Sequence, residues 1–370
     1  MSSGQARPYI GGQAVLEGVM MRAPKAFAVV VRRRDGSLHV REREVPAHGE
    51  GIARWPFARG LASLVESLRL GSEALRFSVE QLESDMDGGA AGSGRGLRGT
   101  VSALGVALVV IATRDGEAGP PAPPSTASAG ARSRYAMLAL VVLFFVALPQ
   151  GAAAVINRIF HLGYAVQSPA FQAMTGLLKL SIVIGYLLAI RRVPEIRRVF
   201  QYHGAEHKTI STYEAGEPLT VENARPKTTF HPRCGTTFLV MVALVSIVIF
   251  TAVGALLPRI RTGSVVLDNA VFFAEKLPFL PALVALAFEL QRLFARYCTR
   301  GPLRLLLWPG FWVQKITTAE PDDAQLEVAL ASLRATLFRP GNGGLSPGPT
   351  EARFSSYAAL VAGEASTSLP

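Results

Sequence analysis

Three long runs of apolar residues constrain this chain more than any other feature of its sequence. Residues 135–156 and 236–257 are 22-residue runs without a charge, and residues 173–190 form an 18-residue run whose one charge is Lys179. A helix needs about 20 mostly apolar residues to cross the hydrocarbon core of a bilayer. The sequence therefore predicts three membrane-spanning helices.

Two shorter apolar runs lie outside these three. Residues 100–113 number only 14, and residues 277–288 stay apolar for 12 residues before Glu289. Either run could lie at the interface, insert only partway or pack against the other helices; we count the second as a fourth span and leave the first out of the spans. A carboxylate at membrane depth is costly unless it is paired, so we expect Glu289 to pair with Arg292, three residues later.

The fold class that follows is an α-helical multi-pass membrane protein with a small α+β cytoplasmic part. Of the 370 residues, 49% are hydrophobic and only 18% are charged, whereas about a quarter of the residues in a soluble domain are charged. The only two cysteines, Cys234 and Cys298, exclude a disulfide framework and a multi-cysteine zinc ribbon.

The distribution of lysine and arginine predicts the orientation of these spans. Residues 1–134 carry 17 of them, the loop 191–235 carries eight and residues 292–370 carry eight, whereas the loops 157–172 and 259–278 carry one and three. Short loops rich in these residues stay in the cytoplasm, so we place both termini and the 191–235 loop there. The net charge of +11 fits this bias together with contact to anionic membrane lipid, and we expect no nucleic-acid partner.

Two polar segments near the N-terminus have recognisable patterns. Residues 26–45 alternate apolar and polar positions on both sides of Asp35-Gly36, which predicts a β-hairpin. Residues 58–83 carry leucine and valine at helical spacing. This spacing predicts an amphipathic helix that packs on the hairpin or lies on the membrane surface.

Two further segments carry local signals. The stretch 11–20 is punctuated by glycines, which permit close backbone packing, and we expect Glu17 to act there as a capping or pairing group. Residues 321–338 begin with proline followed by Asp322 and Asp323, residues suited to the positive end of a helix dipole, and place leucines on one face. The second segment therefore predicts a cytoplasmic amphipathic helix.

The predicted organisation has seven parts. In chain order they are a cytoplasmic N-terminal region at 1–83, a low-complexity linker at 84–134, a first transmembrane pair at 135–190, a cytoplasmic His/Glu/Cys loop at 191–235, a second transmembrane pair at 236–298, a cytoplasmic C-terminal helix region at 299–338 and a disordered tail at 339–370. The linker and the tail are rich in small residues and proline and carry too little apolar bulk to form a core.

The pattern most suggestive of chemistry is His203-x-x-Glu206-His207 in the cytoplasmic loop. Residues four apart lie on one face of a helix, so His203 and His207 can present their ring nitrogens to one ion. Glu206 lies on the adjacent face, close enough to take a proton from water activated by that ion. This is the inverted zinc-protease pattern, with two histidine ligands and the glutamate as general base.

A second part of the same loop supplies further donors. His231-Pro-Arg-Cys234 stands directly before the span that begins at residue 236, and imidazole together with thiolate is a common zinc set. We therefore expect His203, His207, His231 and Cys234 to converge on one divalent ion, zinc being the expected metal, with Glu206 as the catalytic residue. The plainer interpretation makes the histidines surface groups and the turn a rigid entry to the span.

Several longer segments carry a family resemblance. They are GGQAVLEGVMMRAP at 11–24, RG at 59–60, FQYHGAEHKTISTYEAGEPLTVENAR at 200–225, HPRCGTTFL at 231–239 and WPGFWVQKITTAEPDDAQLEVAL at 308–330. Together they resemble the YqhQ-like bacterial family, a domain-of-unknown-function family whose members carry the label of predicted metal-dependent enzyme. The resemblance covers most of the chain from about residue 9 to residue 338 and implies a multi-pass protein of the bacterial inner (plasma) membrane.

Two functions from different classes fit these observations. In the first, His203, His207 and a third group from His231 or Cys234 hold a divalent ion while Glu206 acts as general base in a hydrolysis at the cytoplasmic face. The second is a non-catalytic membrane scaffold or membrane-protein biogenesis factor, with a structural metal or none. A catalytic zinc keeps an open position beside three protein ligands, whereas a structural zinc is closed by four. Membrane lipid and other membrane proteins are the expected partners.

Overall fold

The computed structural model describes seven parts of the chain. They are residues 8–45, 55–87, 147–258, 262–298, 301–338, 350–363 and 367–369. The expected linker from residue 88 onward, the apolar run at 100–113 and residues 135–146 of the first expected span lie outside the described residues.

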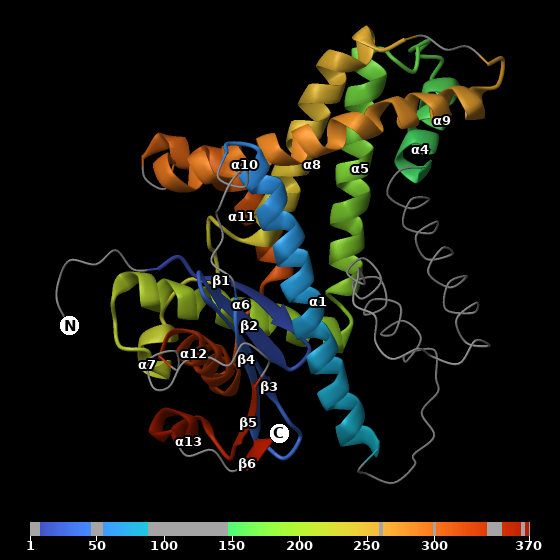
Figure 1. The fold of residues 1–370 in the computed structure, drawn as a ribbon. Helices are drawn as coiled ribbons and strands as arrows, with labels where there is room; N and C mark the ends of the chain where they lie inside the picture. The colour runs from blue at the N-terminus through green and yellow to red at the C-terminus, as the bar shows by residue number, and fades with distance from the viewer. Residues whose placement is uncertain are drawn as a thin grey trace.

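A six-stranded antiparallel sheet lies at one end of the long helices (Figure 1). Its strands pair in chain order, each with the next. The strands are β1 (Gly11–Val15), β2 (Gly18–Ala23), β3 (Ala26–Arg32), β4 (Leu38–Glu44), β5 (Thr350–Phe354) and β6 (Thr367–Leu369).

The predicted hairpin at 26–45 is confirmed as β3 and β4, in which Val30 pairs with Val40. Gly36 adopts a φ of 85° in the turn, a conformation that a side chain disfavours. The Asp35 carboxylate accepts a hydrogen bond from the Ser37 N–H at 2.9 Å, a local contact that stabilises such turns.

The glycine-punctuated stretch before this hairpin forms a second one, β1 and β2, which the sequence pattern did not predict. Its turn includes Glu17 at a φ of 52°. Gly18 has no room for a side chain, because a Cβ would meet the Val30 carbonyl of β3. Glu17 was expected to be either a capping or a pairing group. It is a pairing group, and its carboxylate lies 2.5 Å from the guanidinium of Arg198.

The expectation of a disordered tail at 339–370 is wrong for the residues that the structure describes there. β5 pairs with β4, with Phe354 beside Leu38, and β6 pairs with β5. Phe354 is only 1% exposed. Local composition could not predict this pairing, because the partner strand lies near the other end of the chain.

The described part of the chain also contains eleven α-helices. They are α1 (Ala58–Asp87), α4 (Leu148–Ile159), α5 (Pro169–Ile190), α6 (Pro194–Ala215), α7 (Val221–Ala224), α8 (Gly235–Val253), α9 (Val265–Lys276), α10 (Leu280–Tyr297), α11 (Trp308–Thr317), α12 (Asp323–Phe338) and α13 (Tyr357–Ala362). α1 contains the helix expected at 58–83, and α12 lies within the range 321–338 expected to be helical but begins at Asp323 rather than at Pro321.

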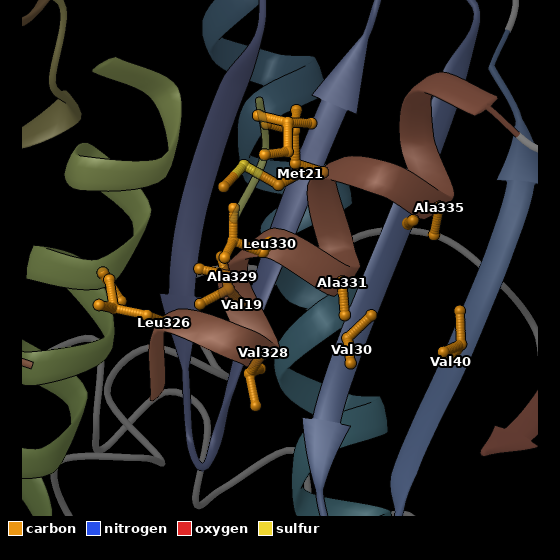
Figure 2. Packing of buried hydrophobic residues seen from close by; sticks show 14 of the residues in the cluster. Val19, Met21, Val30, Val40, Leu326, Val328, Ala329, Leu330, Ala331 and Ala335 are labelled. Carbon is orange, nitrogen blue, oxygen red and sulfur yellow. The ribbon is translucent and has the colours of Figure 1, made fainter. Parts of the chain in front are cut away.

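Helices cover both faces of the sheet. α12 and α6 pack on one face, where Val30 and Val40 of the sheet lie close to Ala331 of α12 (Figure 2). α1 packs on the other face, where its Phe77 joins Phe27 of β3 in a second core. Alternate side chains of β2 to β4 point to opposite faces of the sheet, and they therefore pack into two separate cores.

α12 is buried over more of its circumference than one leucine face, and Glu327 and Arg334 lie on the side that stays partly exposed. Leu326, Leu330 and Leu333 are buried as expected, but Val328 and Ala331 between them are buried too. The sheet, α6, α7 and α13 all pack against this helix. The predicted leucine face is therefore buried, and the buried surface is wider than predicted because small residues between the leucines allow close packing there as well.

Three helices of the described part are long and apolar enough to cross a membrane. They are Pro169–Ile190, Gly235–Val253 and Leu267–Tyr297. The first two are α5 and α8 and coincide with expected spans. The third runs through α9 and α10 and includes the weaker run at 277–288. α5 and α8 pack on each other, and the sheet with its helices lies at one end of the pair (Figure 1).

α1 links the sheet to these apolar helices. Its start packs on α10, where Gly60 lies against Phe288. The expected pairing of Glu289 with Arg292 is not the one observed, since both oxygens of this carboxylate bind the guanidinium of Arg59 on α1. The partner comes from a distant segment, which spacing along α10 could not reveal.

Candidate metal centre

One helix, α6, carries three of the expected site residues. Pro194 begins it and Gly216 ends it with a φ of 77°, signals that favour a helix start and a helix stop. Between them lie His203, Glu206 and His207. Glu206 and His207 are buried and His203 is half-buried, because α6 packs on α12, β1 and β2.

Backbone carbonyls hold both histidine rings. Nδ1 of His203 lies 2.9 Å from the Thr317 carbonyl oxygen, and Nδ1 of His207 bonds to the Thr229 carbonyl oxygen. A carbonyl only accepts, so the Nδ1 of each ring carries a proton, and each Nε2 is the nitrogen that can face an ion once it is deprotonated. The ring centroids lie 4.5 Å apart, so the two Nε2 atoms are neighbouring candidate ligand atoms for an ion.

Cys234 joins these histidines from the start of α8. Its Sγ lies 3.1 Å from Nε2 of His203 and accepts a hydrogen bond from the Thr236 N–H at 3.4 Å. The ligand atoms of His203, His207 and Cys234 all lie within 4.8 Å of one another. The sequence placed these three residue types together correctly.

Electrostatics favour the thiolate in this group. Burial alone would raise the pKa of Cys234, but the adjacent His203 and His207 hold the pKa well below that of a free thiol. Burial lowers the pKa of His203, yet the neighbouring thiolate outweighs burial and brings this pKa to about 9. A metal ligand must be deprotonated, so a divalent ion would compete with the proton that this pair shares.

His231 lies next to the group without joining it. Its ring centroid is 5.7 Å from that of His207, but its Nε2 faces the Glu214 carboxylate at 3.4 Å. The buried Gln314 fixes its backbone, accepting from the His231 N–H at 2.8 Å and donating to its carbonyl at 2.7 Å. Three of the four expected ligands therefore come together, and the fourth stands beside them.

Glu206 lies between the histidines and β1. A Cβ on Gly12 would come within 2.7 Å of Oε1 of Glu206, so the strand passes this close because it has glycine there. Oε2 of Glu206 is buried without a hydrogen-bond partner. Burial raises the pKa of Glu206 to about 6, against the lowering effect of His203 and His207. A pKa near neutrality suits a general base or acid.

The donor set fits a divalent ion of the zinc type. Ligands at 2.0–2.3 Å from a tetrahedral zinc are about 3.4–3.8 Å apart, and the separations within the group range around this value, from 3.1 Å to an upper bound of 4.8 Å. Nε2 of His207 is buried without a hydrogen-bond partner, although buried polar atoms are normally paired. An ion bound by His203, His207 and Cys234 would satisfy this nitrogen.

Four residues that shape the site were not singled out from the sequence. Thr229 and Thr317 act through backbone carbonyls, which have no sequence signature. Gly12 makes room for Glu206, and Gln314 fixes His231. Gly12, Gln314 and Thr317 fall in segments that carry the family resemblance, which was the one available signal.

Comparison with known proteins identifies a family without a known activity. A family model described as "Protein of unknown function (DUF1385)" matches residues 55–338. The chain is 30% identical over 343 residues to "Uncharacterized protein YqhQ" of Bacillus subtilis (strain 168), a match that covers 91% of this chain and 95% of that protein. No solved structure matches the chain.

Proposed function

The chain belongs to the DUF1385 family of proteins of unknown function, and from the geometry of its His/Cys group we propose that it is a metal-dependent hydrolase at the cytoplasmic face of a bacterial plasma membrane. One observation carries the proposal. Next to three converging ligand atoms stand two buried atoms, Nε2 of His207 and Oε2 of Glu206, that have no hydrogen-bond partner among the residues that the structure describes. A ligand site combined with an unpaired buried carboxylate is typical of a catalytic centre.

Each residue of the group has a role in this proposal. His203, His207 and Cys234 hold the ion, and the carbonyls of Thr317 and Thr229 orient the two imidazoles. When bound, the ion supplies a Lewis acid. Glu206 takes a proton from the attacking water and returns it to the leaving group of the bond that breaks.

Placement at a membrane surface is supported by the exposed apolar side chains of three helices. Leu177 on α5 and Val248 on α8 are large apolar side chains that stay exposed, because nothing in the described part of the chain covers them. α11, which supplies Gln314 and the Thr317 carbonyl to the site, carries Trp308 and Trp312 at 57% and 69% exposure. Tryptophan is enriched where a membrane meets water, so we place the site at that level.

A scaffold with a structural metal is the rival function. Such a site is closed by four protein ligands, and neither ring nitrogen of His231 lies within the group of His203, His207 and Cys234. The group of three leaves one position open, which favours the enzyme.

A thiol-dependent reaction is a second candidate within the enzyme class. Cys234 Sγ lies 3.1 Å from His203 Nε2 at the N-terminus of α8, two conditions that activate a cysteine nucleophile. In that case Cys234 attacks the substrate, His203 carries the proton and no ion is needed. Metal content separates this candidate from the hydrolase.

The first test is metal analysis of the full chain purified in detergent. We expect about one zinc-type ion per chain in the wild type, loss of the ion in His207→Ala and Cys234→Ala, and retention in Glu206→Gln. His161→Ala, which changes an exposed histidine outside the group, is the matched control. A wild type without metal would overturn the proposal and leave the thiol-dependent candidate.

The second test separates enzyme from scaffold. Membranes from cells that produce the wild type or Glu206→Gln are compared for lipids and for peptides, because the variant keeps the ion and loses the proton acceptor. We expect one class of molecule to accumulate with Glu206→Gln. Identical membranes, with equal amounts of both folded proteins, would favour the scaffold.

A further inference from the structure

Two lysines lie among the apolar helices, away from the metal centre. Lys179 stands at the middle of α5, and Lys276 ends α9. Ionisable residues within membrane-spanning segments are costly and usually mark a pathway or a binding site. Neither lysine has a role in the proposed hydrolysis.

Lys276 is held inside the helix bundle rather than directed to its outside. It is 8% exposed, and its Nζ donates to Oε1 of Gln172 at 2.6 Å. The same Nζ lies 4.2 Å from the ring centroid of Phe272 and 5.2 Å from that of Phe250. An amide and two aromatic rings attract an ammonium, but they do not neutralise its charge.

Lys179 adds a second positive charge nearby. It lies seven residues after Gln172 on the same helix, about two turns or 10 Å along one face, and it is half-buried. Lys276 bonds to Gln172, so both lysines lie along the same face of α5. Within the part of the chain that the structure describes, Lys179 makes no hydrogen bond or ion pair.

No carboxylate compensates these charges among the described residues. Glu275, beside Lys276 in the sequence, makes no ion pair with either lysine there, and Asp268 binds the N–H and hydroxyl of Thr262. The two ammonium groups therefore form an unbalanced positive pair in an apolar part of the molecule.

A third polar group points to the same place. The hydroxyl of Thr251 on α8 is buried without a hydrogen-bond partner. Thr251 lies between Ile247, which contacts Gly176 of α5, and Gly254, which contacts Gln172. Residues 247, 251 and 254 share one helix face, so Thr251 faces the part of α5 that carries Gln172, the residue bound by Lys276.

From this juxtaposition we propose that Lys179, Lys276 and Thr251 form an oxyanion-binding site between α5, α8 and α9. The ligand chemistry is that of a phosphate group, carried by a phospholipid head group or present as free phosphate. Two ammonium groups and a hydroxyl donate to its oxygens, and the anion balances the charge that the described protein leaves unpaired. The site is separate from the metal centre and does not depend on the hydrolase proposal.

The test uses the full chain, purified in mild detergent and stripped of lipid. Native mass spectrometry counts the molecules retained after addition of phosphatidylglycerol, phosphatidylcholine with the same acyl chains, or inorganic phosphate. We expect phosphatidylglycerol or phosphate to be retained in preference to phosphatidylcholine. Lys179→Met and Lys276→Met should each bind at least about tenfold more weakly, the effect of losing one charge-assisted hydrogen bond.

Two further variants guard against misfolding and surface effects. The double variant Lys179→Arg/Lys276→Arg keeps both charges and should retain most of the anion binding. Lys315→Met removes an exposed lysine on α11 and should leave the anion binding unchanged. Retention of phosphatidylglycerol alone identifies a lipid, and displacement of it by phosphate identifies the free ion. Equal retention by the wild type and a monodisperse Lys179→Met/Lys276→Met protein, or no anion binding in the wild type, would overturn the proposal.

Discussion

Gly12 shows how a single residue controls the position of the candidate general base. Its missing side chain lets β1 pass beside Glu206, because a Cβ would come within 2.7 Å of Oε1. Gly11, its neighbour, has space, since the nearest atom to an added Cβ is 4.0 Å away. The two glycines therefore form a matched pair for a test.

We predict that Gly12→Ala destabilises the protein by about 1–3 kcal/mol, the usual cost of overpacking, and displaces the Glu206 carboxylate. Gly11→Ala should leave stability within about 0.5 kcal/mol of the wild type, as for other surface substitutions. Thermal unfolding of both variants in detergent measures the difference. Equal unfolding temperatures would mean that β1 and Glu206 do not touch.

The site was predictable from the sequence where its residues lie close together along the chain. The four-residue interval places His203 and His207 on one helix face, and Cys234 belongs to the same polar loop. The orientation of His231 depends on Gln314 of α11 and on Glu214, two contacts across long sequence separations. Such contacts have no local signature, which is why four side chains were expected to converge and only three are observed to do so.

Among the elements, β5 departs most from the sequence-based expectation. It continues the sheet beyond β4 and inserts Phe354 into the core that α12 covers. The hairpin of β3 and β4 was predictable because Asp35-Gly36 is a local turn signal. β1, β2 and β5 were not, because glycine-rich or short strands gain their order from partners rather than from their own propensity.

We predict that Phe354→Ala lowers the free energy of unfolding by about 3–5 kcal/mol, because a fully buried aromatic ring leaves a cavity. Val361→Ala on the neighbouring α13, where the side chain is 49% exposed, should cost less than about 0.5 kcal/mol. Denaturant unfolding of both variants in detergent provides the comparison. A Phe354→Ala protein as stable as the control would show that residues 350–354 are dispensable, as expected for a disordered tail.

At the scale of the whole molecule, the sheet and α6, the helix of His203 and His207, lie at one end of α5 and α8 (Figure 1). Lysine and arginine counts predict that this end faces the cytoplasm. The three apolar helices agree with spans expected from the sequence, whereas the membrane side is a prediction of charge alone. Cys298 and Cys234 are buried, so introduced cysteines can report accessibility.

We predict that Ala215→Cys, at the exposed end of α6, is not labelled by a membrane-impermeant thiol reagent in intact cells. His161→Cys, in the exposed turn after α4, should be labelled because the loop 157–172 carries one basic residue. Lysed cells provide the control, in which both positions should react. Labelling of Ala215→Cys in intact cells would place the metal centre on the outer face.

X-ray absorption spectroscopy at the metal edge of the purified, zinc-loaded full chain is the most direct measurement of the proposed centre. We predict two imidazole nitrogens at about 2.0–2.1 Å, one sulfur at about 2.3 Å and one further light atom. Cys234→Ala should lose the sulfur contribution, and Glu206→Gln should keep the nitrogen and sulfur ligands. A first shell without sulfur, or one with three imidazole nitrogens, would contradict the group of His203, His207 and Cys234.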